Sequence, residues 1–210
     1  MEPNAIHDLL CAKLGEAALE YVDSYEKGTV IAAAKIAEAA TLLRDEPELH
    51  FEQLMCLSGV DWDGHDAEGK GKSVAILGYT EEGKPELSDR VGDGDLGVFY
   101  ACYSHRHGHK YSLFVRVPRD AAEVPTVSHL WPTAAWHERE AYDLVGITFT
   151  GHPDLRRILL EDGWEGHPLR KDYQMPAQWQ GVPLEGRSYA ANPFNEADVV
   201  LPTKPEGGQG

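Results

Sequence analysis

Apolar side chains near the start of the chain recur at helical spacing. Between residues 5 and 14 they stand three or four positions apart, which predicts a short helix. An Ala-rich stretch predicts a second helix from Thr29, a candidate N-terminal cap, to about Arg44, because Pro47 cannot continue it. The spacing of Phe51, Leu54 and Met55 predicts a third, short helix over 51–57.

Alternating apolar and polar positions then predict strands. We expect strands over 21–25, 73–79, 97–105 and 110–117. The last two flank the sequence RHGH, which is typical of a hairpin turn. The next periodic segment predicts a helix from Pro132 to Val145, with Gly146 well placed as its left-handed C-terminal residue.

The order of these elements indicates the fold class. Helices come first, strands follow, and one more helix precedes an irregular stretch, so the chain lacks an alternating strand–helix pattern. We therefore predict an α+β fold with a largely antiparallel sheet packed with helices. Three regions are expected: 1–131 as an N-terminal α+β domain, 132–173 as a helix with two rigid turns, and 174–210 as an extended irregular C-terminal arm.

Composition and charge narrow the possible partners. The 210 residues are 42% hydrophobic, enough for a sizeable core, and carry a formal net charge of −16. Such an acidic chain is not expected to bind nucleic acid or anionic lipid by general electrostatics. The N-terminus does not resemble a signal peptide, and no stretch is apolar over the roughly 18 residues that span a bilayer. We expect a cytoplasmic protein that meets a membrane only through a partner.

Several apparent cofactor motifs fail when their context is considered. GDGDLG (92–97) fits a dinucleotide-binding loop, but its two aspartates would repel phosphate and a strand follows it. HRHGH (105–109) aligns three histidines only on an extended strand, and Gly108 predicts a turn there. The sequence that begins at His137 lacks the second histidine of a zinc-protease motif, and DWDGHD (61–66) lacks the spacing of a calcium loop. The three cysteines are Cys11, Cys56 and Cys102. Their wide spacing argues against a structural zinc or iron–sulfur site built by this chain alone, and suggests buried thiols in a reducing compartment.

The segment 136–173 concentrates the unusual chemistry. It reads WHEREAYDLVGITFTGHPDLRRILLEDGWEGHPLRKDY and contains two Gly-His-Pro turns, each followed by basic residues. Glycine permits a positive φ and proline fixes φ, so these turns are expected to be stiff. On the helix, Arg139 and Asp143 are four residues apart, a spacing that predicts an ion pair.

Two functions are compatible with this segment. It contains no nucleophile with a matching base and no complete metal-ligand spacing, which favours a preorganised ion-pair scaffold or docking surface. The alternative is a free-standing soluble enzyme that uses the histidines and carboxylates of 137–172, because burial can tune their pKa values.

The same segment closely resembles the pattern of the complex I 30-kDa subunit family, which in bacteria belongs to the proton-pumping NADH–quinone oxidoreductase NDH-1. The pattern begins with E-R-E-x-x-D, continues through G-H-P-x-L-x-R, and ends with G-x-x-G-H-P-L-R-K-D. The positions that we single out as a docking or structural signature are Glu138, Arg139, Glu140, Asp143, Gly146, Gly151, His152, Pro153, Arg156, Arg157, Gly166, His167, Pro168, Arg170, Lys171 and Asp172.

This resemblance implies a subunit without catalytic, cofactor-binding or metal-binding residues of its own. Members of the family are peripheral-arm components that pack against the 49-kDa-type subunit and the iron–sulfur subunits, on the cytoplasmic side of the cell membrane. The whole complex is expected to use NADH, FMN, iron–sulfur clusters and quinone. The resemblance also leaves open the equivalent subunit of a membrane-bound hydrogenase-type complex.

Overall fold

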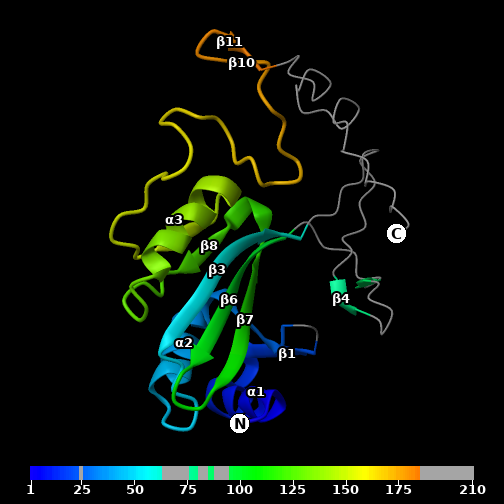
Figure 1. Cartoon of the computed structure of the whole chain (residues 1–210), viewed down its shortest axis with the longest axis vertical. Helices are drawn as coiled ribbons and strands as arrows, with labels where there is room; N and C mark the ends of the chain where they lie inside the picture. Colours follow the sequence, from blue (N-terminus) through cyan, green and yellow to red (C-terminus); the bar gives the residue numbers. More distant parts are fainter. Residues whose placement is uncertain (24–25, 63–75, 80–84, 88–94, 185–210) are drawn as a thin grey trace, which may run out of the picture. The chain divides into compact units, whose positions relative to one another are not determined.

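The structure is a computed structural model of the whole chain. It describes residues 1–23, 26–62, 76–79, 85–87 and 95–184. The chain divides into two compact units, Met1–Tyr173 and Gln174–Gly210 (Figure 1). Within the described ranges, no helix combines the length and the apolar character that crossing a bilayer would require.

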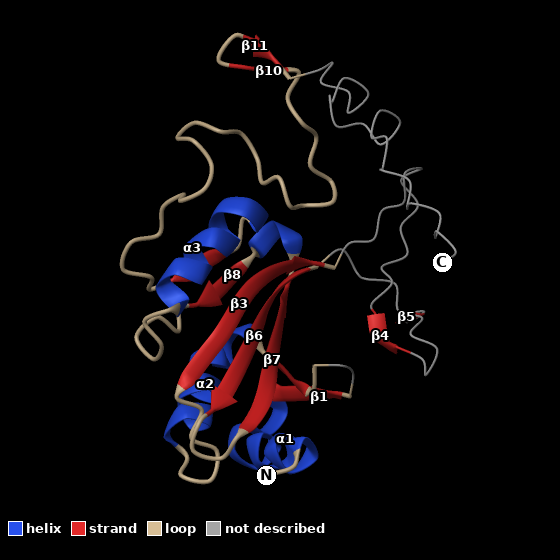
Figure 2. Cartoon of the chain, in the orientation of Figure 1, coloured by secondary structure: helices blue, strands red, loops and turns tan. Residues whose placement is uncertain are grey.

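A five-stranded sheet lies at the centre of the first unit (Figure 2). Its strand order is β1-β2-β7-β6-β3, and only the β2–β7 pair is parallel. The predicted α+β class with a largely antiparallel sheet is therefore confirmed. The strands are β1 (Ala18–Val22), β2 (Gly28–Ile31), β3 (Gln53–Asp61), β6 (Leu96–Ser104) and β7 (His109–Val117). Two smaller sheets pair β4 (Ile76–Tyr79) with β5 (Pro85–Leu87), and β8 (Glu123–Pro125) with β9 (Thr148–Thr150).

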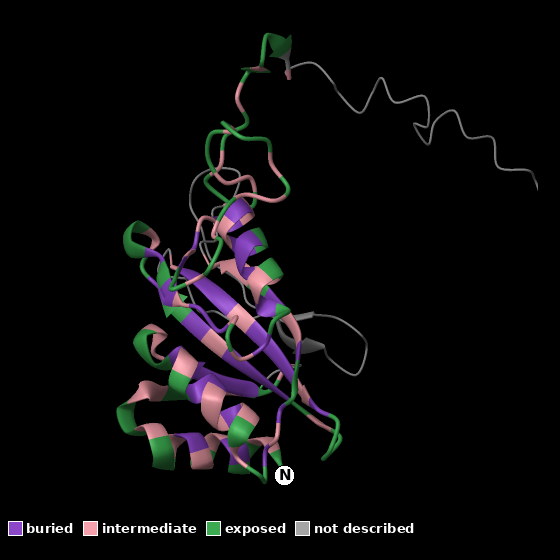
Figure 3. Cartoon of the chain, turned by 90° about the vertical axis from the view of Figure 1, so that its left-hand side faces the viewer, coloured by how far each residue is buried: buried purple, intermediate pink, exposed green. Residues whose placement is uncertain are grey.

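Three helices supply the other half of the core. Alternate residues of β6 and β7, such as Val98, Tyr100 and Leu113, are buried in one cluster with apolar residues of all three helices. In Figure 3 the strands are largely buried, while the outer turns of the helices are exposed. The helices are α1 (Pro3–Leu14), α2 (Ile36–Asp45) and α3 (Ala134–Val145), and three 3-10 turns cover Gly15–Ala17, Ala33–Lys35 and Arg119–Ala121.

The predicted helices over 5–14 and 132–145 are confirmed, and so is the hairpin of β6 and β7. Gly146 ends α3 with φ +80°, as expected of a left-handed C-terminal residue. Gly108 lies in the hairpin turn with φ +65°.

The prediction of a helix from Thr29 is wrong over its first seven residues, 29–35. Residues 28–31 form strand β2, which is buried along its whole length beside β7. The Thr29 hydroxyl does not cap a helix; it lies 2.6 Å from the Tyr111 hydroxyl and 2.9 Å from His7 Nδ1. The helix begins only at Ile36. A tertiary partner therefore overrides the helix propensity of the Ala-rich sequence.

The predicted helix over 51–57 is also wrong, because this stretch leads into strand β3. Leu54 and Leu57 are both buried although they stand three residues apart. A β-bulge between Leu54 and Cys56 shifts the register with β6, so both leucines face the core. Because the bulge adds one residue, the two buried leucines are three positions apart, a spacing that is also typical of a helix.

Other predicted segments differ in extent. The strand predicted over 21–25 is β1 and ends at Val22, and the strand predicted over 73–79 is described only as β4. Residues 63–66 of the DWDGHD motif and 92–94 of the GDGDLG motif lie outside the described residues. In the second unit, residues 174–184 contain a two-stranded hairpin of β10 (Gln178–Trp179) and β11 (Val182–Pro183).

Candidate functional site

Helix α3 carries the first part of the 136–173 segment and packs closely on β3. A Cβ atom at Gly59 would lie 2.9 Å from Val145 Cγ2 and 3.2 Å from the Ala141 Cβ atom. Glycine at this position therefore lets the helix approach the strand backbone. The opposite side of the helix leaves Trp136 exposed and turns Arg139 and Asp143 toward the segment that follows.

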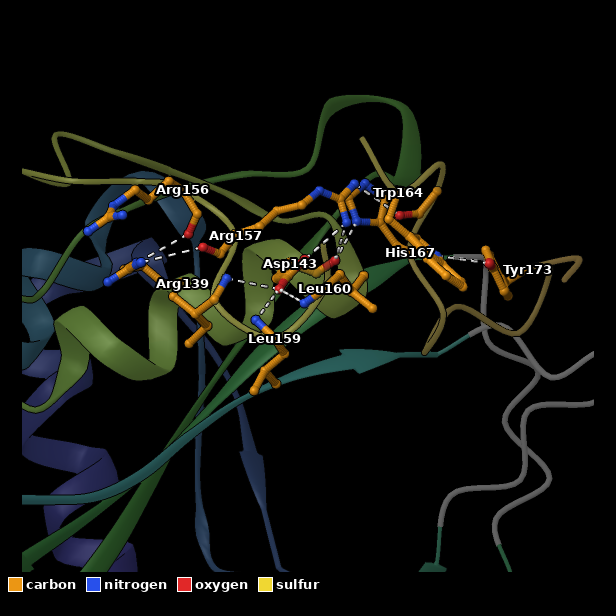
Figure 4. A network of polar contacts seen from close by, with 11 residues as sticks. Arg139, Asp143, Arg156, Arg157, Leu159, Leu160, Trp164, His167 and Tyr173 are labelled. Atoms are coloured by element: carbon orange, nitrogen blue, oxygen red, sulfur yellow. Dashed lines mark hydrogen bonds and ion pairs between the residues drawn. The ribbon is translucent and has the colours of Figure 1, made fainter. Parts of the chain in front are cut away.

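Asp143 organises the loop after the first Gly-His-Pro turn (Figure 4). Its side chain is fully buried. The Oδ2 atom accepts hydrogen bonds from three successive backbone N–H groups, those of Ile158 (3.0 Å), Leu159 (2.7 Å) and Leu160 (3.0 Å). The Oδ1 atom accepts one from Arg157 Nη1 at 3.0 Å. One carboxylate thus fixes a loop that has no secondary structure of its own.

These contacts decide the charge state of Asp143. Burial raises the pKa of its carboxyl, but the three backbone N–H groups and Arg157 outweigh burial, so the pKa lies below its ordinary value. The predicted Arg139–Asp143 pair is wrong, because Asp143 pairs with Arg157. The spacing rule considers only the helix, whereas the loop offers four better-placed donors.

Arg139 instead binds backbone carbonyl groups of the same loop. Its Nε donates to Arg156 O at 3.2 Å and its Nη2 to Arg157 O at 3.4 Å. Its guanidinium also lies 5.1 Å from the centre of the Trp136 ring and 3.9 Å from an Asp154 oxygen. Arg139 and Asp143 therefore hold the same loop through its acceptors and its donors, respectively.

The second Gly-His-Pro turn caps the C-terminal end of α3. The last carbonyl groups of a helix have no partner within the helix. Here the Asp143 carbonyl oxygen lies 2.9 Å from His167 Nδ1, and the Leu144 carbonyl accepts from the Leu169 N–H at 3.0 Å. The Val145 carbonyl then accepts a hydrogen bond from Arg170 Nε at 2.6 Å. A cation at this end of the helix is also favoured by the helix dipole.

Gly146 makes this cap possible in two ways. Its φ of +80° is a conformation that side chains rarely adopt, and its backbone adjoins the capping residues. A Cβ atom here would lie 2.5 Å from both Arg170 Nη2 and His167 Cδ2. The predicted positive φ of the turn glycines is likewise confirmed, at +82° for Gly151 and +80° for Gly166.

The first Gly-His-Pro turn is fixed to the start of α3. The His152 side chain is 1% exposed, and its Nε2 lies 3.0 Å from Ala135 O. Its Nδ1 accepts a hydrogen bond from the Asp154 N–H at 3.0 Å. Because Nδ1 accepts and Nε2 faces a carbonyl oxygen, these contacts fit the neutral imidazole protonated at Nε2.

Glu138 lies beside this histidine and is fully buried. It accepts hydrogen bonds from the Thr126 hydroxyl at 2.5 Å and the Val127 N–H at 2.8 Å. Burial raises the pKa of Glu138, and the hydrogen bonds from Thr126 and Val127 only partly oppose this. Glu138 and Asp143 therefore have pKa values shifted in opposite directions on one helix.

A second anchor holds the end of the segment and was not predicted from the sequence. Asp61, at the end of β3, accepts hydrogen bonds from Arg119 Nη2 at 2.5 Å and the Lys171 N–H at 2.9 Å. Arg119 Nη1 also donates to Asp172 Oδ1 at 3.1 Å. No spacing rule links positions that are 110 residues apart in the chain.

The remaining signature residues lie nearer the surface. Arg156 is 71% exposed and pairs with Asp154, and Pro153 is exposed while Pro168 is half-buried. Glu140 is exposed and has no hydrogen-bond or ion-pair partner in the described part of the chain. These are the positions that remain available to another molecule.

The predicted turn histidines contact the start of β3 and the residues just before it, and they do not converge on a common ligand. The nearest partners of their Nε2 atoms are Gln53 Oε1 for His105 (2.7 Å), Pro47 O for His107 (3.0 Å) and Leu49 O for His109 (2.9 Å). Over the ranges that the structure describes, no group of three or more His, Cys, Asp or Glu side chains is arranged to hold a metal ion.

Comparisons with known proteins identify the family of this chain. The family model described as "Respiratory-chain NADH dehydrogenase, 30 Kd subunit" matches residues 29–179. The chain belongs to this family. It is 36% identical to the C subunit of the NADH-quinone oxidoreductase of Chlorobium phaeobacteroides, over 85% of this chain and 92% of the relative. It is 33% identical to the corresponding C subunit of Mycolicibacterium smegmatis, over 89% of this chain and 73% of the relative.

The length of the relatives varies. The match with the C subunit of Chloroherpeton thalassium, at 38% identity, covers 68% of this chain but only 48% of the relative. Two solved structures share the fold. A trypsin-resistant fragment of Nqo5 has a TM-score of 0.50 at 22% identity, with 71% of this chain and 98% of the fragment covered. A component of an archaeal membrane-bound sulfane sulfur reductase has a TM-score of 0.56 at 20% identity, with 83% and 86% covered.

Proposed function

We propose that the chain is a non-catalytic peripheral subunit of a proton-pumping NADH–quinone oxidoreductase. In this role it braces the 49-kDa-type subunit and the iron–sulfur subunits, while NADH, FMN, iron–sulfur clusters and quinone are bound elsewhere in the complex. It would lie on the cytoplasmic side of the membrane and reach the membrane only through the assembled complex.

One observation supports this proposal most directly. Several side chains of the 136–173 segment belong to the types used in acid–base catalysis or in charge stabilisation, but they contact backbone groups of their own chain. Asp143 binds three N–H groups, and Arg139, His167 and Arg170 lie against carbonyl oxygens. An acid–base catalyst instead needs side chains that converge on a position that substrate can reach. The arrangement therefore favours a rigid surface over an active site.

A tagged full-length chain, recovered from gently solubilised membranes, tests the proposal. We expect 49-kDa-type and iron–sulfur subunits in the eluate by mass spectrometry, together with iron–sulfur absorbance. An electron-input subunit that oxidises NADH would identify the NADH form, whereas a hydrogenase-type input subunit would favour the related complex. A lone, colourless protein would contradict the proposal and favour the soluble-enzyme alternative.

Deletion of residues 174–210 tests how the chain is held in its complex. Met1–Tyr173 is a compact unit, so the shortened chain should fold, with a cooperative unfolding transition like that of the full chain. We expect it to be lost from the purified complex, since the isolated aromatic residues of 174–210 need a surface to bury them. Normal incorporation of the shortened chain would contradict this role for the arm.

A further inference from the structure

Strand β3 forms one edge of the central sheet. Among the described strands it pairs with β6 alone, and its sequence QLMCLSGVD contains neither proline nor lysine. Natural proteins usually protect an exposed strand edge with such residues, because unpaired N–H and C=O groups attract other strands. The β-bulge between Leu54 and Cys56 protects only the first part of β3, and the absence of proline and lysine suggests that the rest of this edge is covered in the working protein.

The register shows which backbone groups remain available on β3. Asp61 lies opposite Leu96, and the next residue, Trp62, donates its N–H to Asp95 O at 3.0 Å. In an antiparallel pair, alternate residues direct their N–H and C=O groups toward the partner strand. The backbone N–H and C=O groups of Val60 and Ser58 therefore point to β6, like those of Trp62, while those of Leu57 and Gly59 point away from β6.

The outward groups have almost no partners of their own. Within the described part of the chain, their hydrogen bonding amounts to one long contact, 3.4 Å from the Ser58 hydroxyl to Gly59 O. Leu57 is only 3% exposed, so the accessible groups of this edge are the N–H and C=O of the half-buried Gly59. One extended backbone can pair with both groups at once.

A shallow hollow adjoins this edge, between β3 and the side of α3 that faces this strand. Its apolar lining is Leu57, Gly59, Ala141, Leu144, Val145 and Leu169, and its polar lining is Ser58, His137 and Glu140. Leu169 is 59% exposed. In a strand added beside β3, every second side chain would point to this face of the sheet. An apolar side chain of an added strand would therefore contact exposed apolar residues at this hollow, such as Leu169.

Glu140 gives the site a charge. It lines the same hollow, and it is the signature acid that the described contacts of the 136–173 segment leave unused. Its neighbours Glu138 and Asp143 both have several hydrogen bonds. An unpaired carboxylate at the rim favours a partner that carries a lysine or arginine close to its apolar anchor.

We infer that the β3 edge and the adjoining hollow bind an extended segment of another subunit, which adds to the sheet as a sixth strand. The segment places an apolar side chain at the hollow and a basic side chain beside Glu140. This inference rests on the proposed function, because it needs an assembled complex to supply the strand. It adds the chemistry of the partner segment and its place on the sheet.

Residue-resolved hydrogen exchange tests the inference on the full chain, first alone and then within the purified complex. In the free chain the amide of Gly59 should exchange fast, and those of Ser58 and Val60, which face β6, slowly. In the complex, Gly59 should slow by at least about tenfold, because its N–H group gains a backbone acceptor. This alternating pattern is specific to strand addition and would not arise from contact with side chains alone.

A charge reversal provides an independent measurement. Glu140→Lys should lower the fraction of chain recovered in the complex by about threefold or more. It should leave the unfolding of the free chain unchanged, since Glu140 has no ion-pair partner among the described residues. Glu48→Lys is the matched control, because Glu48 is also exposed but lies outside the hollow, before β3. We expect it to assemble like the wild type.

The outcomes separate this inference from the proposed function. An intact complex in which Gly59 still exchanges fast would overturn the strand addition and leave the proposed function standing. Recovery of the chain without partner subunits would overturn both. Protection of this amide in the free chain that increases with concentration would assign the edge to a second copy of the chain, and would also overturn the inference.

Discussion

Replacement of Asp143 by alanine should be among the most damaging single changes in the chain. The substitution removes the acceptor of three backbone N–H groups and the partner of Arg157 at once. It leaves α3 itself intact, because alanine is a good helix former. The loss should therefore appear as a detached loop after the first Gly-His-Pro turn, not as a broken helix.

The size of the effect follows from these contacts. A hydrogen bond to a charged group is worth about 1.5–3 kcal/mol, but several bonds to one carboxylate are not additive. The freed N–H groups belong to residues that are partly exposed, so water can replace part of the loss. Breaking a buried pair on one side typically costs about 3–5 kcal/mol, and we expect that range for Asp143→Ala. In a domain of this size the corresponding fall in Tm is about 6–20 °C.

Urea unfolding of the full chain measures this loss directly. Asp154→Ala is the matched control, because Asp154 is 55% exposed and its partner Arg156 is also at the surface. We expect the control to unfold at the same urea concentration as the wild type. A change of less than about 1 kcal/mol for Asp143→Ala would refute the reasoning, since it would mean that the loop holds its place without the carboxylate.

The stability lost in Asp143→Ala should depend on pH, and the pKa shift of Asp143 gives the direction of this dependence. The folded state lowers the pKa of Asp143, so its contribution is present above the unfolded value of about 3.9 and is lost as pH falls through the folded pKa. The difference in stability between wild type and Asp143→Ala should be constant above about pH 5 and shrink below about pH 4. A difference that grows toward low pH would contradict the assigned charge state.

Three further changes test other parts of the scaffold. Burial raises the pKa of Glu138, so protonation of its carboxyl favours the folded state. The stability of the wild type in urea, measured relative to Glu138→Gln, should therefore rise as pH falls toward about 4.5. A difference that does not change with pH would contradict this. Gly146→Ala should cost about 1–2 kcal/mol more than Gly151→Ala by thermal unfolding, because both need a positive φ but only the Gly146 Cβ meets Arg170; equal costs would count against the close cap. Arg139→Ala should destabilise the free chain by about 1–3 kcal/mol, and the assembled complex should keep its turnover per complex; a stable variant in a slow complex would argue for a role in the chemistry.

Local features of this protein could be predicted from the amino-acid sequence. The period of α3, the left-handed Gly146 and the two stiff glycine turns are set by side-chain spacing and by the freedom of φ at glycine. The β6–β7 hairpin follows from the same kind of local rule. The signature of the 136–173 segment also sufficed to predict the family.

Contacts between distant segments could be found only in the folded chain. The bulge in β3 gave two core leucines a helical spacing, and the burial of 28–31 beside β7 overrode a helix-prone sequence. Asp143 pairs with Arg157 because the loop after the first Gly-His-Pro turn passes beside α3. The contact between Asp61 and Lys171 joins a strand and a turn that no local rule connects. Local rules describe neighbours along one element, whereas a buried charge takes whichever donors the fold brings to it. The edge position of β3 is likewise a property of the whole sheet, because the strand order of the folded sheet decides which strands have only one neighbour.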